Sequence, residues 1–106
     1  MGTFVNIENI ATDGSGDGQK DVPAGGILAL IDIVPEDSSS FDITISRLLP
    51  DGTLAPIYAA TGVTALSTID RANMNQSSIE LAGPVRVVLA NAGEHDDAAH
   101  VYLTVV

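Results

Sequence analysis

The sequence alternates apolar and polar residues with a period of two through several short runs. FDITIS at 41–46, VRVVLA at 85–90 and HVYLTVV at 100–106 all show this alternation. A β-strand that buries one face requires it, because successive side chains point to opposite sides of the sheet. Segments rich in Gly, Pro, Asp, Asn and Ser separate the runs at short intervals, as turns do. The pattern predicts an all-β chain that folds as an antiparallel β-sandwich of the jelly-roll or Ig-like kind.

About eight short strands are expected, and only the segment 61–75 also allows a helix. Val63, Leu66 and Ile69 recur there every three residues, but enrichment in Thr, Val and Ile favours strands. Neither an internal repeat nor a long linker divides the 106 residues. One domain is therefore expected, with residues 1–25 as a candidate N-terminal arm plus loop. The expected strands cover residues 3–11, 26–34, 41–49, 54–60, 63–70, 77–81, 84–91 and 99–106.

The composition excludes several classes of function. Fourteen Asp and Glu against four Lys and Arg give a formal net charge of -10. Binding to nucleic acid or to an anionic membrane requires clustered cations, so neither partner is expected. The chain has no Cys, which excludes disulfides, thiolate catalysis and Cys-type zinc sites. No signal-peptide pattern or membrane-spanning run is found, so we expect a soluble protein made in a reducing compartment.

The stretch DGSGDGQKD at 13–21 has the oxygen spacing of a calcium loop. Asp13, Ser15, Asp17 and Asp21 match ligand positions 1, 3, 5 and 9, and Gly18 matches the sixth, where such loops turn sharply. The twelfth position lacks the usual bidentate Glu, and both flanks have the pattern of strands instead of helices. A turn between strands uses the same residue types. These four side chains are thus either candidate Ca²⁺ ligands or parts of a plain turn, and the missing Glu favours the turn.

No other motif supports a cofactor or catalysis. His95 and His100 lie with three acidic residues in EHDDAAH at 94–100, but their spacing matches no established metal motif. A solvated hairpin tip whose acids protect a sheet edge explains the same residues. The sequence has no nucleophile elbow, no recognisable triad and no phosphate-binding glycine loop. An enzyme is not expected.

The run ILALIDIV at 27–34 is apolar on both faces except at Asp32. Such a strand is either central in the sheet or has a second face covered by another subunit. An unpaired carboxylate there would be costly, so we expect Asp32 to pair with Arg86, with Arg47 or with a partner subunit, unless it reaches solvent at a strand end. The candidate interface residues are Leu28, Leu30, Asp32, Val34 and Arg86.

The order of these elements resembles a group of small virion proteins of tailed bacteriophages. In that pattern, a Gly/Ser/Asp loop closes on KDV or KDI, and a GILALIDIV-type strand and a DITIS-type strand follow. The second half contains IELAGPVRVVLANAG, a polar hairpin and HVYLTVV. The corresponding residues of this chain are 14–22, 26–34, 42–46, 79–93 and 100–106.

The resemblance implies a β-sandwich virion component of the capsid decoration, or cement, type. Its partner would be the major capsid protein, and it would act as a homo-oligomer or as many copies on a lattice. It would be made in the host cytoplasm and would lie on the capsid exterior, reinforcing the shell. Two alternatives stay open: another virion role, such as head–tail joining or fibre association, and a calcium-dependent binding module that uses the 13–21 loop.

Overall fold

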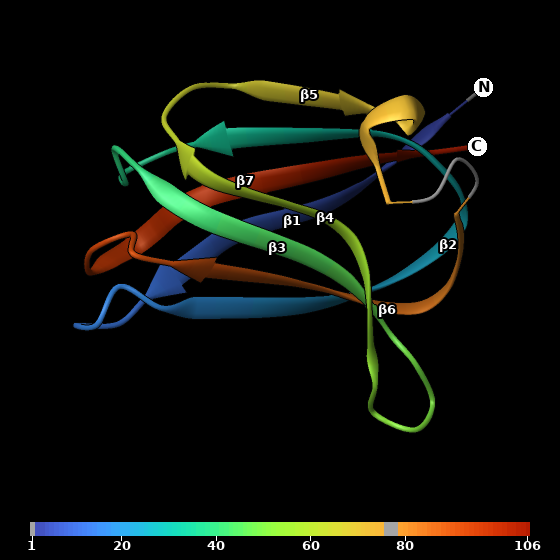
Figure 1. Cartoon of the computed structure of the whole chain (residues 1–106), viewed down its shortest axis with the longest axis horizontal. Helices are drawn as coiled ribbons and strands as arrows, with labels where there is room; N and C mark the ends of the chain where they lie inside the picture. Colours follow the sequence, from blue (N-terminus) through green and yellow to red (C-terminus); the bar gives the residue numbers. More distant parts are fainter. Residues whose placement is uncertain (1, 76–78) are drawn as a thin grey trace.

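The computed structural model describes residues 2–75 and 79–106, which form seven strands and one short 3₁₀ turn (Figure 1). All pairings between the strands are antiparallel. No helix in the described part of the chain is long and apolar enough to cross a membrane. The elements are β1 (Thr3–Thr12), β2 (Gly18–Pro35), β3 (Phe41–Leu48), β4 (Leu54–Val63), β5 (Ser67–Asp70), the turn η1 (Arg71–Asn73), β6 (Glu80–Ala90) and β7 (His95–Val105).

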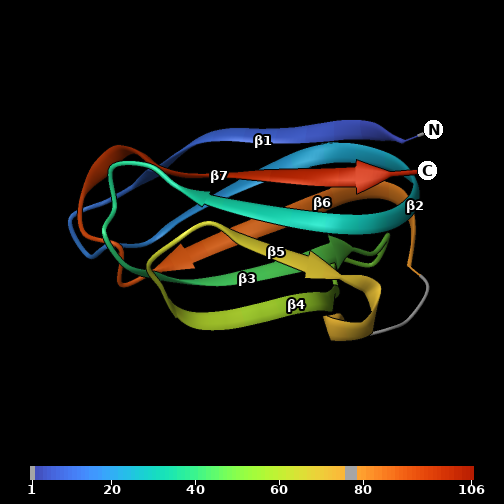
Figure 2. The same ribbon diagram turned by 90° about the horizontal axis from the view of Figure 1, so that it is seen from above.

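The strands form two stacked layers, which confirms the predicted antiparallel β-sandwich (Figure 2). One layer, here called sheet A, has the order β1-β7-β2-β5. The other, sheet B, has the order β2-β6-β3-β4. Strand β2 therefore belongs to both layers.

Strand β2 passes from sheet B to sheet A through a bend in its middle. Residues 18–27 pair with β6 in sheet B, whereas residues 28–35 pair with β7 in sheet A. Gly26 lies at the change of sheet with a φ of +97°, a conformation that residues with a Cβ rarely adopt. A Cβ there would also lie 3.2 Å from the carbonyl oxygen of Val106. Such corners allow one strand to serve both layers of a sandwich.

The core lies between the two sheets and is built from aliphatic side chains. Phe41 is the single aromatic residue among the buried residues that the structure describes. Each fully buried Ile, Leu or Val contributes roughly 1.5–3 kcal/mol relative to an exposed position. The fully buried aliphatic residues include Ile7, Ile10, Leu28, Ile31, Ile33, Ile45, Ile57, Val85, Val87, Leu89, Val101 and Leu103.

Several expected boundaries were wrong because turn-forming residues lie inside strands. The expected loop at 13–25 is confined to residues 13–17, since β2 already begins at Gly18. Pro23 and Pro84 are register partners in the β2–β6 pair, next to the Arg47–Val85 pair with which the β3–β6 pairing ends. Proline is tolerated where no ladder hydrogen bond is lost, so neither residue interrupts its strand.

The remaining differences concern the middle of the chain and the last hairpin. The expected strand 63–70 is divided, because β4 ends at Val63 and only Ser67–Asp70 form β5, followed by η1. The expected strands 77–81 and 84–91 join into β6 from Glu80 onward, and residues 77–78 lie outside the described part of the chain. Strand β7 begins at His95, four residues before the expected start at 99.

We predict that Gly26→Ala destabilises the fold by about 1–3 kcal/mol, because alanine is strained at positive φ and its Cβ meets the chain near Val106. The matched control is Gly25→Ala. There the nearest atom is 3.8 Å from the added Cβ, and the change should cost less than about 1 kcal/mol. Urea unfolding of both variants measures the difference. Equal losses would contradict the importance of the corner.

Candidate functional site

The outer face of sheet A carries a shallow groove of about 490 Å³. We call it the sheet A groove. Its side chains come from three strands and from the link between β4 and β5. They are Phe4, Asn6, Asp32, Val34, Leu66 and Tyr102.

Strand register brings the groove residues together from distant parts of the sequence. Tyr102 on β7 lies between Asn6 on β1 and Asp32 on β2, because it is the register partner of both. Thr68 on β5 continues this row beyond Asp32. Residues abreast in a sheet point to the same face, so the row forms a continuous strip across sheet A.

Two apolar side chains at the groove are unusually exposed. Phe4 is 68% exposed and Leu66 is 66% exposed, the two largest values among the exposed large hydrophobic residues. The remaining groove residues on β2 and β7 are half-buried. Apolar side chains gathered around a concavity are typical of a binding surface.

The polar groups of the groove are held in place by neighbouring side chains. The hydroxyl of Thr68 donates a hydrogen bond to Asp32 across the β2–β5 pair. His100 lies beside Tyr102, with 3.1 Å between its Nδ1 and the Tyr102 hydroxyl, and its Nε2 lies 3.0 Å from Asp97 Oδ2. Desolvation, followed by the negative charges of Glu8, Glu36 and Asp97, raises the pKa of Tyr102. The Tyr102 hydroxyl therefore stays protonated and can donate a hydrogen bond.

The structure divides the predicted interface residues between three locations. Leu30, Asp32 and Val34 are half-buried on β2 in sheet A, and the latter two line the groove. Leu28 is fully buried in the core, so its assignment to an interface was wrong. The register shift between Leu28 and Leu30 changes which side chains face inward. Arg86 lies in sheet B, away from the groove.

The predicted pair of Asp32 with Arg86 was also wrong. Arg86 forms a two-pronged ion pair with Asp21, with distances of 2.8 and 2.9 Å, and this contact lowers the pKa of Asp21. Asp21 is the register partner of Arg86 on the sheet B half of β2, whereas Asp32 lies on the sheet A half. The bend in β2 thus separates Asp32 from Arg86. No ion pair of Asp32 with Arg47 is found among the described residues either.

The candidate calcium ligands are not brought together as a set. Asp13 Oδ1 accepts hydrogen bonds from the backbone N–H groups of Ser15 and Asp17, as in an ordinary turn. Asp21 lies on β2 in its ion pair with Arg86. Within residues 2–75 and 79–106, no cluster of three or more His, Asp or Glu side chains could hold a metal ion. The geometry favours the interpretation of 13–17 as a turn.

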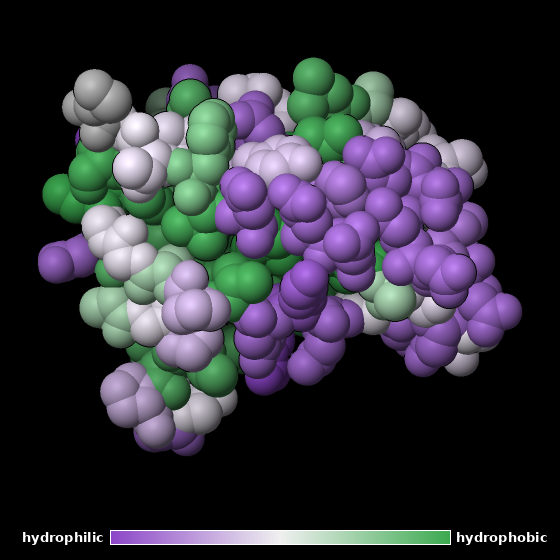
Figure 3. Space-filling view, turned by 180° about the vertical axis from the view of Figure 1, so that it is seen from behind, coloured by the Kyte–Doolittle hydropathy of each residue, from purple (hydrophilic) through white to green (hydrophobic). Residues whose placement is uncertain are grey.

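One end of the sandwich is strongly hydrophilic (Figure 3). The turns β1–β2 and β6–β7 are joined there by the hydrogen bond from the Ala92 N–H to the Gly16 carbonyl. The turn β2–β3 is joined to the start of β7 by the hydrogen bond from the Asp37 N–H to the Asp97 carbonyl. His95 and His100 point to different partners, since His95 Nε2 lies 2.9 Å from the Ala92 carbonyl oxygen. Seven of the fourteen acidic residues lie at this acidic end: Asp13, Asp17, Glu36, Asp37, Glu94, Asp96 and Asp97.

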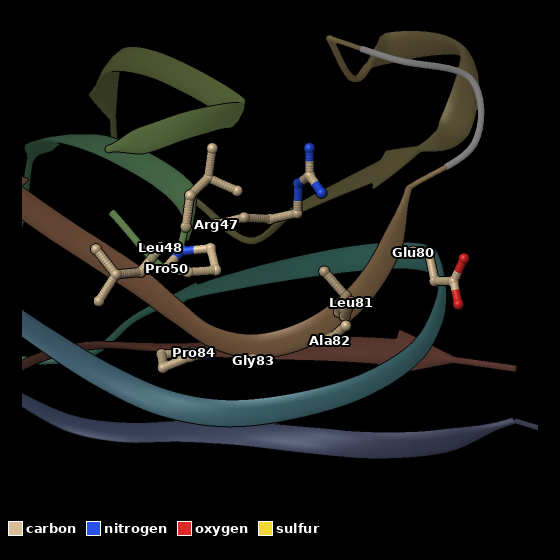
Figure 4. A pocket seen from close by; sticks show the side chains of 9 residues that line it. Arg47, Leu48, Pro50, Glu80, Leu81, Ala82, Gly83 and Pro84 are labelled. Carbon is tan, nitrogen blue, oxygen red and sulfur yellow. The ribbon is translucent and has the colours of Figure 1, made fainter. Parts of the chain in front are cut away.

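A second, smaller hollow of about 230 Å³ lies between the end of β3 and the start of β6 (Figure 4). Arg47 and Glu80 are the charged residues of its lining, and no ion pair joins them. The rest of the lining is aliphatic side chain, proline and glycine. The sheet A groove, with its aromatic, amide and carboxylate groups, has the richer binding chemistry.

Sequence reasoning identified Asp32 and Val34 but missed the other four residues of the groove. Phe4, Leu66 and Tyr102 lie in segments about 35 to 60 residues apart, and only strand register brings them together. One signal in the sequence could have identified Phe4 and Leu66. Each is a large apolar residue at a position where the alternation of its expected strand allows exposure.

No protein-family model matches the chain, and no curated protein matches its sequence. Among solved structures, it is similar to chitosan-binding module 1 of a chitosanase/glucanase from Paenibacillus sp. IK-5, with a TM-score of 0.58 and 15% identity over 95% of this chain and 76% of that one. It is also similar to the N-terminal domain of the single-strand break repair protein XRCC1, with a TM-score of 0.60 and 7% identity over 88% of this chain and 75% of that one. The family 32 carbohydrate-binding module of Streptococcus pneumoniae EndoD is similar with a TM-score of 0.55 and 13% identity, over 87% of this chain and 71% of that one. These similarities establish a shared β-sandwich fold.

We predict that calcium does not change the melting temperature of the protein. A ligand stabilises a fold only if it binds the folded state, and Asp13 Oδ1 and both carboxylate oxygens of Asp21 already have other partners. Thermal melts in calcium and in EDTA measure this directly. A large calcium-dependent rise would contradict the turn interpretation and restore the calcium-binding module.

Proposed function

We propose that the protein is a non-catalytic structural component of a virion, which decorates the outside of the capsid and contacts it through the sheet A groove. Its partner is the major capsid protein, and many copies reinforce the shell. The protein is made in the host cytoplasm and joins the capsid after synthesis. The exposed apolar pair Phe4 and Leu66 beside the groove is the observation that carries the proposal.

The energetics of the groove suit a protein contact. Covering a large apolar side chain removes its surface from water, which yields roughly 25 cal/mol per Å² buried. Aromatic anchors near the centre of an interface usually carry much of its binding energy, and Tyr102 has that position in the groove. The same face contains Leu30 and Val34, which the sequence had already suggested as interface residues.

The charge distribution agrees with an external position on the shell. A formal net charge of -10 opposes contact with packaged nucleic acid, whose phosphates repel carboxylates. Seven acidic residues lie at the acidic end, whereas the groove contains a single carboxylate, Asp32. This carboxylate already accepts a hydrogen bond from Thr68. The apolar part of the groove can therefore meet a partner without burying many charges.

Copy number tests the proposed role. Quantitative mass spectrometry of purified virions of the encoding phage should give an abundance comparable to that of the major capsid protein. A few copies per particle would instead support head–tail joining or a fibre-associated role. Absence from the particles would contradict a virion function altogether.

A pair of variants tests the groove. Leu66→Glu should weaken binding to capsids assembled without this protein at least tenfold, because the contact would bury an unpaired charge. Leu54→Glu is the matched control, since Leu54 is 39% exposed but lies in sheet B. Co-sedimentation with the capsids measures both. Equal binding by both variants would show that the contact lies elsewhere.

Carbohydrate binding is a second candidate, favoured by the composition of the groove. An aromatic ring beside an amide and a carboxylate, here Tyr102 with Asn6 and Asp32, can stack on a sugar and accept its hydroxyl hydrogens. Two of the similar solved structures are described as chitosan- and carbohydrate-binding modules.

Affinity electrophoresis in gels containing polysaccharides, chitosan among them, tests this candidate. Retarded migration that is lost in Tyr102→Ala but kept in Tyr58→Ala, a tyrosine of sheet B, would support it. If no polysaccharide in the gels slows the wild-type protein, carbohydrate binding is contradicted and the capsid proposal is unaffected.

A further inference from the structure

Three of the four sheet edges carry features that prevent pairing with another chain. Strand β4 contains Pro56 and two register shifts, and the Asn75 N–H donates to the Ile57 carbonyl at its outer edge. Strand β5 has only four residues. The sheet B half of β2 carries Lys20 and Pro23. Short strands, bulges, lysine and proline are the devices that natural proteins use on exposed edges.

The fourth edge, residues 3–7 of β1, has none of these features. TFVNI contains no charged residue, glycine or proline, and its pairing with β7 is regular from Thr3 to Ile7. Among the described residues, no hydrogen bond reaches this segment apart from those of the β1–β7 pair. Figure 2 shows β1 as the outermost strand of its layer. Beyond Ile7, a register shift and the Lys20 ammonium group, which donates to the Glu8 carbonyl, close the edge.

We propose that two copies of this chain pair through residues 3–7 of β1, antiparallel about a twofold axis at Val5. The pairing satisfies the free backbone groups of both edges and makes sheet A continuous across the dimer. In this register, Phe4 lies opposite Asn6 of the second copy, and Thr3 lies opposite Ile7. The segment runs from Thr3, where β1 begins, to Ile7, beyond which Lys20 binds the Glu8 carbonyl, so its central residue is Val5.

The side chains fit this arrangement on both faces of the sheet. Directly opposed residues of antiparallel strands point to the same face. The exposed Phe4 ring therefore packs over the pair on the outer face, while half-buried Val5 meets Val5 of the second copy on the inner face. The contact covers a residue that is 68% exposed in the single chain.

Charge favours a second copy in the antiparallel direction. Five residues of the acidic end lie in the turns, and Asp96 and Asp97 lie at the start of β7, which pairs with the Thr12 end of β1, the opposite end from Thr3. Antiparallel pairing places the two acidic ends at opposite extremes of the dimer, where salt screens their repulsion. Parallel pairing would bring them side by side.

The dimer goes beyond the proposed function, because it adds a contact between copies at the edge of β1. Phe4 and Asn6 belong to both this edge and the groove, and the other four groove residues remain for the capsid. It would place two sheet A grooves on one continuous surface. Two linked sites bind a repeating lattice more tightly than either site alone.

Size-exclusion chromatography with light scattering, over a wide range of concentration, tests the pairing. The wild-type chain should reach twice its 10.9 kDa mass. The double variant F4K/N6K places lysine opposite lysine in both symmetric pairs and should remain monomeric. The double variant F4K/N6E places lysine opposite glutamate and should restore the dimer. Phe4 and Asn6 are exposed, so thermal melts should show that both variants fold.

The masses of the three chains distinguish pairing in this register from association through the Phe4 ring alone. A wild-type mass of 10.9 kDa at every concentration, or open growth beyond two copies, would overturn the proposal. Monomers for both double variants would also overturn it, because the association would then depend on the Phe4 ring and not on the register. Capsid binding is not measured, so a failure here leaves the proposed function in place.

Discussion

The bend of β2 at Gly26 is the constraint on which the rest of the structure depends. One strand pairs with β6 before the bend and with β7 after it, so the two layers are joined through continuous backbone as well as through their core. The bend needs a residue that tolerates a φ of +97° and the nearby Val106 carbonyl, and glycine meets both conditions. It also assigns Asp21 and Asp32, eleven positions apart, to different sheets with different partners.

The fold class followed from the sequence because alternation with a period of two is a local signal. The continuity of β2 and β6 did not, because it depends on pairing between distant segments. Pro23, Gly25 and Pro84 all carry the local signature of a turn, yet the two prolines face each other where no ladder bond is lost. Tertiary pairing overrode local preference at those positions.

The candidate site was only partly accessible from the sequence for the same reason. The two-sided apolar pattern of 27–34 predicted interface residues at Leu28, Leu30 and Val34. Leu30 and Val34 are half-buried in sheet A, but a register shift sends Leu28 to the core. Tyr102 and Phe4 enter the groove through strand order, which no local pattern encodes. The spacing of oxygens from Asp13 to Asp21 matches a calcium loop in the sequence. In the structure, however, Asp21 lies on β2 in an ion pair with Arg86.

The scarcity of aromatic residues gives the groove its own optical label. The chain has no Trp and two Tyr, of which Tyr58 lies in sheet B and Tyr102 lies in the sheet A groove. The tyrosine absorption band and tyrosine emission therefore come from just these two rings, with no tryptophan to mask them. A Tyr58→Phe chain would carry a single emitting ring. The intensity and anisotropy of this emission would report the hydration, packing and rotation of Tyr102 in the groove, without an attached dye.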